Sequence, residues 1–288
     1  MTTIQRVFVA GAGLMGHGIA QVHAAIGLAV TLYEPDLVRA EAGRDRIAGN
    51  LDRAVAKGRL TSVERNATLA RLTATANIGA VADADLVVEA VFEDLEVKRT
   101  LWRELDRLAL PNAVFASNTS SIAIGSLAEA VAPSRRAQFI GMHFFSPVPV
   151  MPLVELIRAE STSEATVEVV RALAADLGKQ VIVSADRPGF IVNRILMPFL
   201  ADAMRILEAG VGTAEDIDAG ARVGLNHPMG PLELADFIGL DVCLGIMRVL
   251  EAELDLAHLQ PPQVLEALVA AGHLGQKTGR GFYVYPRD

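Results

Sequence analysis

The sequence predicts an α/β protein: a mostly parallel sheet covered by helices, followed by a smaller all-α domain. Three observations predict it. They are a glycine-rich turn between an apolar strand and a helix, apolar strands alternating with helices over the first 186 residues, and purely helical spacing after them. Alternation of this kind is typical of a parallel sheet. The 288 residues suffice for two domains, which we expect to span residues 1–186 and 187–288.

The chain opens with a strand–helix–strand unit. Residues 6–10 form a short apolar run, as expected of a strand buried on both faces. The glycine-rich residues 11–16 make a turn, residues 19–26 continue with helical spacing, and residues 28–33 form a second strand that ends at Glu34. Such a unit is the building block of a doubly wound sheet. The sequence therefore predicts a Rossmann-like domain.

Residues 36–71 break this rhythm with a long, charged, helix-favouring stretch that has turn signals at Lys57 and Gly58. We expect this stretch to form a helical hairpin that projects from the sheet. The alternation then resumes, with strands expected at residues 85–89, 113–116, 139–143, 153–157 and 180–183 and a helix at residues 163–177. From residue 190 the pattern is helical, with helices expected at residues 191–208, 213–223 and 232–254.

Composition narrows the possible classes of function. The 26 basic and 34 acidic residues give a net charge of −8, so a general nucleic-acid-binding surface is not expected. Cys243 is the only cysteine, which excludes internal disulfides and a cysteine-based metal site. The histidines show no metal-ligand spacing, so we expect no metal. Because no uncharged run of about 18 apolar residues and no signal peptide is visible, we expect a cytoplasmic protein without a membrane segment.

The glycine-rich turn has the spacing of a dinucleotide-binding loop. Gly11 and Gly13 permit a tight turn and a close approach of backbone N–H groups to a pyrophosphate, while Gly16 lets helix and strand pack closely. Glu34 ends the second strand, where a carboxylate accepts hydrogen bonds from a ribose diol and repels a 2′-phosphate; the nearby Asp36 adds to this effect. We therefore expect NAD rather than NADP. A glycine-rich turn without a ligand is the alternative.

A histidine and a carboxylate stand on two predicted apolar strands. Alternation along residues 153–157 gives two apolar faces, one of which carries Glu155. Burying an unpaired carboxylate is costly, so a partner is predicted, and His143 at the end of a neighbouring strand is the obvious one. An imidazole oriented by a carboxylate suits a general base that accepts an alcohol proton. The alternative is a pair that only supports the sheet.

Three further polar features each allow two interpretations. Residues 117–121, Ser-Asn-Thr-Ser-Ser, follow a predicted strand, where open parallel sheets bind ligands, but such residues are also ordinary in loops. Asn193 lies on an apolar helix at the start of the second domain, where an amide can bind a carbonyl or satisfy a neighbouring backbone group. Arg53, Lys57 and Arg59 form a basic patch on the hairpin, which suits either a phosphate-rich ligand or a solvated helix face.

Seven short stretches in order resemble the short-chain L-3-hydroxyacyl-CoA dehydrogenases, which include bacterial 3-hydroxybutyryl-CoA dehydrogenases. They are residues 11–16 (GAGLMG), 88–93 (VEAVFE), 117–121 (SNTSS), 141–145 (GMHFF), 188–194 (PGFIVNR), 226–231 (NHPMGP) and 277–283 (KTGRGFY). The similarity extends over essentially the whole chain. It implies NAD-dependent, reversible oxidation of an L-3-hydroxyacyl-CoA to the 3-oxoacyl-CoA, as in fatty-acid β-oxidation.

The resemblance also implies roles for individual residues. His143 would be the catalytic base and Glu155 its partner, while Ser120 and Asn193 would bind the substrate oxygen. NAD would be contacted by the glycine-rich loop and by residues farther along the chain: Gly11, Gly13, Leu14, Met15, Gly16, Glu34, Glu93, Lys98, Asn118, Ser120, Ser146 and Lys277. The acyl-CoA would meet Ser120 and three hairpin residues: Asn50, Arg53 and Lys57. The helical second domain would form the interface of a homodimer.

At one position the chain departs from the family pattern. Ser146 follows two phenylalanines, where many members of the family have asparagine, so a hydroxyl replaces an amide close to the expected nicotinamide. Two other functions remain open. One is a dehydrogenase of the same fold that acts on a non-CoA hydroxy acid, of the carnitine or gulonate type. The other is a non-catalytic NAD-binding protein.

Overall fold

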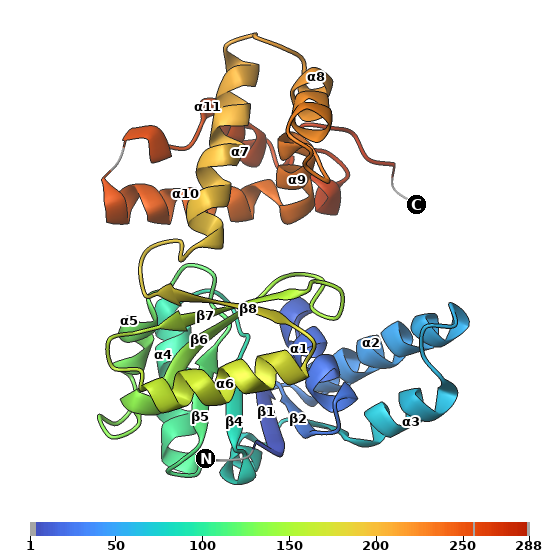
Figure 1. Cartoon of the computed structure of the whole chain (residues 1–288), viewed down its shortest axis with the longest axis vertical. Coiled ribbons are helices and arrows are strands. Elements are labelled where there is room, and N and C mark those ends of the chain that lie inside the picture. Colours follow the sequence, from blue (N-terminus) through green and yellow to red (C-terminus); the bar gives the residue numbers. More distant parts are fainter. Residues whose placement is uncertain (1–3, 256, 287–288) are drawn as a thin grey trace. The chain divides into compact units, whose positions relative to one another are not determined.

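The computed structural model describes residues 4–255 and 257–286, and the chain divides into two compact units, Met1–Arg187 and Pro188–Asp288 (Figure 1). The first unit contains one sheet, with the strands β1 (Arg6–Ala10), β2 (Ala29–Tyr33), β3 (Leu72–Thr75), β4 (Leu86–Glu89), β5 (Val114–Ser117), β6 (Phe139–Phe144), β7 (Leu153–Arg158) and β8 (Gln180–Ala185). The order across the sheet is β3-β2-β1-β4-β5-β6-β7-β8. Neighbours pair in parallel except β6 and β7, which are antiparallel, so the predicted mostly parallel sheet is confirmed.

Helices cover both faces of this sheet. They are α1 (Leu14–Ala25), α2 (Leu37–Ala56), α3 (Ser62–Ala70), α4 (Leu95–Leu108), α5 (Ile124–Ala128) and α6 (Glu164–Asp176), with the short 3₁₀ helices η1 (Ile78–Asp83) and η2 (Arg136–Gln138). Val9 of β1 shares one core cluster with Ile19 of α1 and Val170 of α6. On the other face, the Trp102 ring of α4 stacks on Phe115 of β5 with ring centroids 4.9 Å apart. Alternate strand residues therefore supply two separate apolar layers.

The predicted helical hairpin is present as α2 and α3, between β2 and β3. Asp36 caps α2 by accepting a hydrogen bond from the backbone N–H of Val38, and Thr61 and Glu64 form a capping box at the start of α3. The sequence prediction did not include β3. Only Leu72 of this four-residue strand is fully buried, because β3 lies at the edge of the sheet, and an edge strand leaves a weak apolar pattern in the sequence.

The second unit is helical, as predicted, with α7 (Val192–Glu208), α8 (Ala214–Ala219), α9 (Pro231–Ile238), α10 (Leu240–Leu254) and α11 (Gln263–Ala270). The short segments η3 (Gly220–Gly224) and η4 (Ala257–Leu259) lie between them, and η5 (Gln276–Thr278) follows α11. The prediction of a single helix over residues 232–254 is wrong, because Gly239, with φ of 106°, separates α9 from α10. This left-handed backbone region favours glycine and cannot continue a helix. The helix expected over residues 213–223 is likewise divided, into α8 and the π-helical turn η3.

A histidine with an altered pKa lies inside the first unit. His23 of α1 is fully buried, and its Nδ1–H donates to the carbonyl oxygen of Ile19 at 2.8 Å. Its Nε2 has no hydrogen-bond partner among residues 4–255 and 257–286. Burial lowers the pKa of His23 from 6.5 to about 4, although the bond to Ile19 acts in the opposite direction.

We predict that His23 makes the protein less stable as the pH falls through this window. The unfolded chain binds a proton on His23 near pH 6.5, whereas the folded chain binds it only near pH 4, so the free energy of unfolding decreases by about 1.4 kcal/mol per pH unit between them. Urea unfolding measures the free energy of unfolding at pH 7 and at pH 4. The decrease between these two pH values should be roughly 3 kcal/mol smaller in His23→Leu than in the unaltered protein. His258→Leu, at an exposed position, is the control. An identical pH dependence in His23→Leu and the unaltered protein would contradict the prediction.

Candidate active site

Most of the predicted site residues of the first unit gather at one edge of the sheet. The loop beginning at Gly11 follows β1, Glu34 follows β2, Glu93 follows β4 and Ser120 follows β5. His143 lies near the end of β6, which is parallel to these strands. Because the carboxyl ends of parallel strands meet at the same edge, these side chains come from distant parts of the sequence to the place where open α/β sheets bind their ligands.

The glycine-rich loop is shaped by contacts that exclude a side chain at two of its positions. A Cβ added at Gly11, where φ is 104°, would lie 2.5 Å from the carbonyl oxygen of Ala90. A Cβ at Gly16 would lie 1.7 Å from the carbonyl oxygen of Gly11. A Cβ at Gly13 would meet no atom within 4 Å. Gly11 and Gly16 are therefore needed for the turn itself. Gly13 faces open space, as is required of a loop that admits a pyrophosphate.

The ends of the loop also suit a dinucleotide. Leu14, which is 70% exposed, and the half-buried Met15 begin α1, so the N-terminal backbone groups of this helix follow the loop directly. Glu34 Oε1 accepts a hydrogen bond from the backbone N–H of Ala12 at 2.7 Å, and this anchors the carboxylate beside the loop. The exposed Asp36 caps α2. A fixed carboxylate at the end of the second strand is what recognition of a ribose diol requires.

The expected pair of His143 and Glu155 is present. The two residues are directly opposite each other on the antiparallel strands β6 and β7, and His143 Nδ1 lies 3.1 Å from Glu155 Oε2. Glu155 is fully buried and His143 is 4% exposed. With Glu155 ionised, the carboxylate can only accept, so Nδ1–H donates to it and Nε2 carries the acceptor lone pair.

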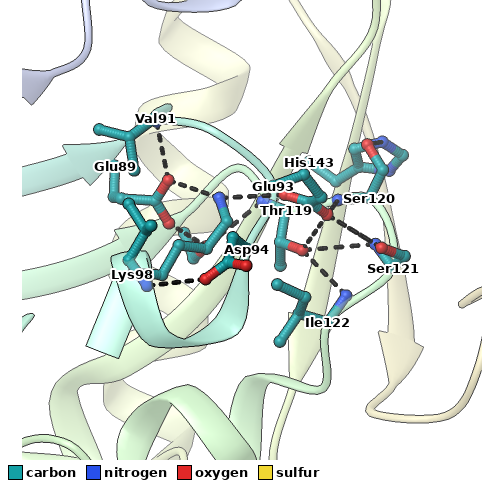
Figure 2. Close-up of polar contacts among 12 residues, drawn as sticks. Glu89, Val91, Glu93, Asp94, Lys98, Thr119, Ser120, Ser121, Ile122 and His143 are labelled. Carbon is teal, nitrogen blue, oxygen red and sulfur yellow. Dashed lines mark hydrogen bonds and ion pairs between the residues drawn. The ribbon is translucent and has the colours of Figure 1, made fainter. Parts of the chain in front are cut away.

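Ser120 meets the other nitrogen of the same imidazole. Its hydroxyl lies 3.1 Å from His143 Nε2, and its backbone N–H donates to Glu93 Oε1 at 2.9 Å. The same carboxylate oxygen accepts bonds from Thr119 Oγ1 at 2.5 Å and from Ser121 Oγ at 3.0 Å (Figure 2). Glu93 therefore holds the loop that carries Ser120 beside His143.

Glu93 is itself paired with Lys98, which the family resemblance assigns to the cofactor. Lys98 is only 1% exposed, and its Nζ lies 3.0 Å from Glu93 Oε2 and 2.6 Å from Glu89 Oε1. Burial by itself raises the pKa of Glu93, but the positive charge of Lys98 and the hydrogen bonds from Thr119 and Ser120 outweigh it and lower the pKa overall. The Glu93 carboxylate is thus strongly favoured in its charged form.

Two further predicted cofactor residues lie on neighbouring loops. Asn118 is buried, and its Oδ1 accepts a hydrogen bond of 2.8 Å from the backbone N–H of Phe144. This bond links the end of β5 to β6. Ser146 is half-buried, directly after the Phe145 ring, which lies 4.5 Å from the His143 ring between centroids. The structure thus brings Asn118, Ser120, His143 and Ser146 to the ends of two adjacent strands.

The predicted CoA residues lie on α2 of the hairpin. A pocket of about 500 Å³ is lined by residues of α1 and α2: His17, Ala42, Asp45, Arg46, Gly49, Asn50 and Arg53. Asn50 accepts a hydrogen bond from Arg53 at 2.5 Å and donates one to Gln21 at 3.2 Å. Lys57 is exposed, at the C-terminal end of α2. Two of the three predicted residues therefore line this pocket.

The other predicted site residues belong to the second unit. Asn193 is 6% exposed and lies in the first turn of α7. Lys277 pairs with Asp241 of α10 at 2.5 Å. An amide can both donate and accept hydrogen bonds and an ammonium group can donate them, so both side chains have the chemistry that their predicted ligand contacts need.

Sequence reasoning missed two residues of this region. Glu89 at the end of β4 is fully buried and contacts Lys98, and Arg46 of α2 donates to the carbonyl oxygen of Ala12 in the nucleotide loop at 3.2 Å. A signal for Glu89 existed: it is a carboxylate in an otherwise apolar strand, the same observation that pointed to Glu155. Arg46 has no such signal, because a charged residue on an amphipathic helix is ordinary.

The fold and the site together define a class of protein. A doubly wound sheet, a dinucleotide loop after β1, a carboxylate after β2 and a buried histidine–glutamate pair at the same edge are typical of nicotinamide-dependent dehydrogenases. Residues 6–187 match the NAD binding domain of 3-hydroxyacyl-CoA dehydrogenases, and residues 189–285 match their C-terminal domain. The chain belongs to the 3-hydroxyacyl-CoA dehydrogenase family, whose members are NAD-dependent oxidoreductases.

Individual relatives agree with this assignment along the whole chain. The chain is 48% identical over 284 residues to a 3-hydroxybutyryl-CoA dehydrogenase of Mycobacterium tuberculosis, covering 98% of this chain and 99% of the relative. It is 42% identical over 294 residues to the human mitochondrial hydroxyacyl-coenzyme A dehydrogenase, covering 98% and 91%. The crystal structure of (S)-3-hydroxybutyryl-CoA dehydrogenase PaaH1 from Ralstonia eutropha superposes with a TM-score of 0.95 at 43% identity, covering 99% of this chain and 100% of that one.

We predict that two glycines of the loop fail in different ways when replaced by alanine. Gly16→Ala places a Cβ 1.7 Å from a backbone oxygen, so it should lower the free energy of unfolding by more than about 2 kcal/mol. Gly13→Ala meets no protein atom, so its stability should remain within about 0.5 kcal/mol, while its dissociation constant for NADH should rise on the order of tenfold. Urea unfolding and NADH fluorescence titration measure the two quantities. Unchanged NADH binding in Gly13→Ala would argue against a pyrophosphate at this loop.

Proposed function

We propose that this protein catalyses the reversible, NAD-dependent oxidation of L-3-hydroxyacyl-CoA thioesters to 3-oxoacyl-CoA, with 3-hydroxybutyryl-CoA as the representative substrate. The observation that carries the proposal is His143, held between the Glu155 carboxylate at Nδ1 and the Ser120 hydroxyl at Nε2. The relatives named 3-hydroxybutyryl-CoA dehydrogenase support the short-chain substrate. The alternatives, a non-CoA hydroxy acid and a non-catalytic NAD-binding role, have no support from these relatives.

His143 is the proposed general base. Its Nε2 takes the proton of the substrate C3 hydroxyl during oxidation and returns it during reduction. The Glu155 carboxylate, 3.1 Å from Nδ1, keeps the imidazole in the tautomer that leaves a lone pair on Nε2. It also stabilises the imidazolium that forms when the proton arrives. Because Glu155 is fully buried, water competes little for this interaction.

Two polar side chains are proposed to bind the substrate oxygen. Ser120 is a donor 3.1 Å from His143 Nε2, so an oxygen that hydrogen-bonds to this nitrogen also comes within reach of the Ser120 hydroxyl. Asn193, in the second unit, takes the second position by analogy with the family. Hydrogen bonds to this oxygen polarise the C3–O bond and orient C3 for hydride transfer.

NAD is the proposed cofactor, and the residues present fit it. The open space at Gly13 and the anchored Glu34 carboxylate are suited to the pyrophosphate and to the ribose diol. Further contacts are proposed for Leu14, Met15, Glu93, Asn118, Ser120, Ser146 and Lys277. Bound NAD⁺ supplies the hydride acceptor. Ser146 offers a hydroxyl where an amide is common in the family, so any contact there is made through a shorter side chain.

The hairpin is the proposed CoA site. Asn50 and Arg53 line the pocket of about 500 Å³, and Lys57 places an exposed ammonium at the end of the same helix. Basic groups on an otherwise acidic protein attract the phosphates of CoA. Arg46, also in the pocket lining, adds a guanidinium that was not foreseen from the sequence.

A homodimer and a cytoplasmic location complete the proposal. Apolar side chains are exposed on the second unit, among them Ile195 at 68%, Val211 at 75% and Val223 at 86%. The dimer is proposed through this unit by analogy with the family, and these side chains are available to such an interface. None of the helices among residues 4–255 and 257–286 is long and apolar enough to cross a membrane. Light scattering after size-exclusion chromatography measures the oligomeric state.

We predict that His143→Gln lowers kcat for NADH-dependent reduction of acetoacetyl-CoA on the order of 10³-fold, because the proton donor and acceptor is lost. Glu155→Gln keeps the side-chain shape but removes the charge, and should lower kcat by roughly 10- to 100-fold. Stopped-flow absorbance of NADH measures both rates. Unchanged NADH binding in both variants is the control for folding. Near wild-type turnover in His143→Gln would show that His143 is not the base.

We predict that Lys57→Met raises the KM for acetoacetyl-CoA on the order of tenfold while kcat changes little, because the ammonium binds phosphate equally in the ground and transition states. Arg44→Met, at an exposed position of the same helix, is the matched control and should leave both constants unchanged. An unchanged KM in Lys57→Met would instead favour a non-CoA hydroxy acid as the substrate.

A further inference from the structure

Three charged residues form a cluster behind the Ser120 loop, and two of them are buried. Glu89 ends β4 and is 0% exposed, Lys98 lies in the early turns of α4 and is 1% exposed, and Glu93 lies on the loop between them. The Lys98 ammonium bridges the two carboxylates, at 2.6 Å from Glu89 and 3.0 Å from Glu93 (Figure 2). Glu93 is the exposed member, with 38% of its side chain accessible to solvent. We call these three residues the charged triad. Burying the charges of Glu89 and Lys98 is costly and requires an explanation.

Glu89 is the anchor of the triad because all its contacts join different elements. Its Oε1 accepts from Lys98 Nζ of α4 and from the backbone N–H of Val91, at 2.9 Å, in the loop after β4. Its Oε2 accepts from Ser117 Oγ of β5 at 2.7 Å. Three donors from three segments converge on this one carboxylate. A Gln side chain of the same size lacks the charge that attracts Lys98 and cannot accept at both ends.

Glu93 transmits this arrangement to the catalytic loop. Its Oε2 contacts Lys98, while its Oε1 accepts from the backbone N–H groups of Ser120 and Ser121, at 2.9 and 3.2 Å, and from the hydroxyl of Thr119. All the contacts to Oε1 come from consecutive residues of one loop. Contacts from Thr119, Ser120 and Ser121 thus meet on a single carboxylate oxygen, while Lys98 contacts the other oxygen of the same group.

Stability alone does not account for the triad. A buried ion pair is often no more stabilising than an apolar pair of the same volume, because removing two charges from water costs as much as their attraction returns. The triad contains one such buried pair, Glu89 and Lys98. Its hydrogen bonds, however, end on Ser120, whose hydroxyl lies 3.1 Å from His143 Nε2. A precise position of that hydroxyl is what the reaction requires.

We infer that Glu89 and Lys98 are positioning residues, which act through Glu93 to hold Ser120 against His143 rather than through contact with the cofactor. This inference rests on the proposed function for the meaning of the Ser120–His143 contact. It also changes the role that the family resemblance implies for Lys98. With its ammonium between two carboxylates and its side chain 1% exposed, Lys98 is enclosed by protein rather than presented to a ligand.

Lys98→Met separates positioning from cofactor binding. If Lys98 positions Ser120, kcat for acetoacetyl-CoA should fall on the order of tenfold or more, while the dissociation constant of NADH, measured by fluorescence, changes less than about threefold. If Lys98 instead contacts the cofactor, NADH affinity falls about tenfold with kcat at saturation retained, and the inference is overturned. Arg103→Met, an exposed position on α4, is the matched control and should change neither quantity.

Glu89→Gln, alone and with Ser120→Ala, distinguishes positioning from a general loss of structure. Because Glu89 acts through Ser120, its effect on kcat should largely disappear once the Ser120 hydroxyl is absent. An effect that is the same in both backgrounds would overturn the inference. Should Lys98→Met fail to fold, the double variant Glu89→Gln/Lys98→Met, which removes both charges together, takes its place.

A measurement without substrate keeps this inference separate from the proposed function. Hydrogen exchange at the Ser120 amide, followed by NMR, reports how firmly Glu93 holds the loop. Exchange should be on the order of tenfold faster in Glu89→Gln than in Arg103→Met, and equal rates would overturn the inference. If the unaltered protein turned over no 3-oxoacyl-CoA, the proposed function would fail, while exchange at Ser120 would still decide whether the triad positions this loop.

Discussion

The antiparallel pairing of β6 and β7 is the constraint on which the site depends. Residues directly opposite in an antiparallel pair have neighbouring side chains, and the register places Glu155 opposite His143. The connection over residues 145–152 is too short for the crossover of about a dozen residues that a parallel pair needs. One reversal in an otherwise parallel sheet thus supplies the carboxylate that orients the imidazole. A shift by one residue would turn Glu155 to the other face.

The site is built from carboxylates placed where apolar strands end. Glu155 on β7 and Glu89 on β4 are both fully buried, and each is engaged by donors from other elements. One of them contacts His143 directly, and the other reaches Ser120 through Lys98 and Glu93. These two routes meet on the two nitrogens of a single imidazole. The first contacts Nδ1, and the second holds the loop whose hydroxyl contacts Nε2.

Local pattern was a sufficient guide wherever the structure is repetitive. Apolar strands predicted β1 and β2 to within a residue, and the carboxylate within an apolar strand pointed to the pairing of Glu155 with His143. The helix α1 was also predicted, but it begins at Leu14, within the glycine-rich turn and five residues earlier than expected. Prediction failed where an apolar pattern continues through a break in the backbone, as at Gly239, or where it is weak, as in the edge strand β3. It also could not show that Lys98 is buried, because burial of a helical lysine depends on the carboxylates that other segments bring to it.

The sequence by itself determined the fold class, the dinucleotide loop and the chemical types at the site, because periodicity and turn chemistry are local properties of the chain. The tertiary structure alone decided the register between β6 and β7, which carboxylate faces which donor, and how Ser120 and Glu155 share one imidazole. These depend on register and on contacts between residues far apart in the chain. Glu89 and Lys98 are nine residues apart, but Glu89 and Ser117 are separated by 28 and Ser120 and His143 by 23. No local pattern specifies contacts between residues this far apart in the chain, because these contacts form only when the strands pack into one sheet.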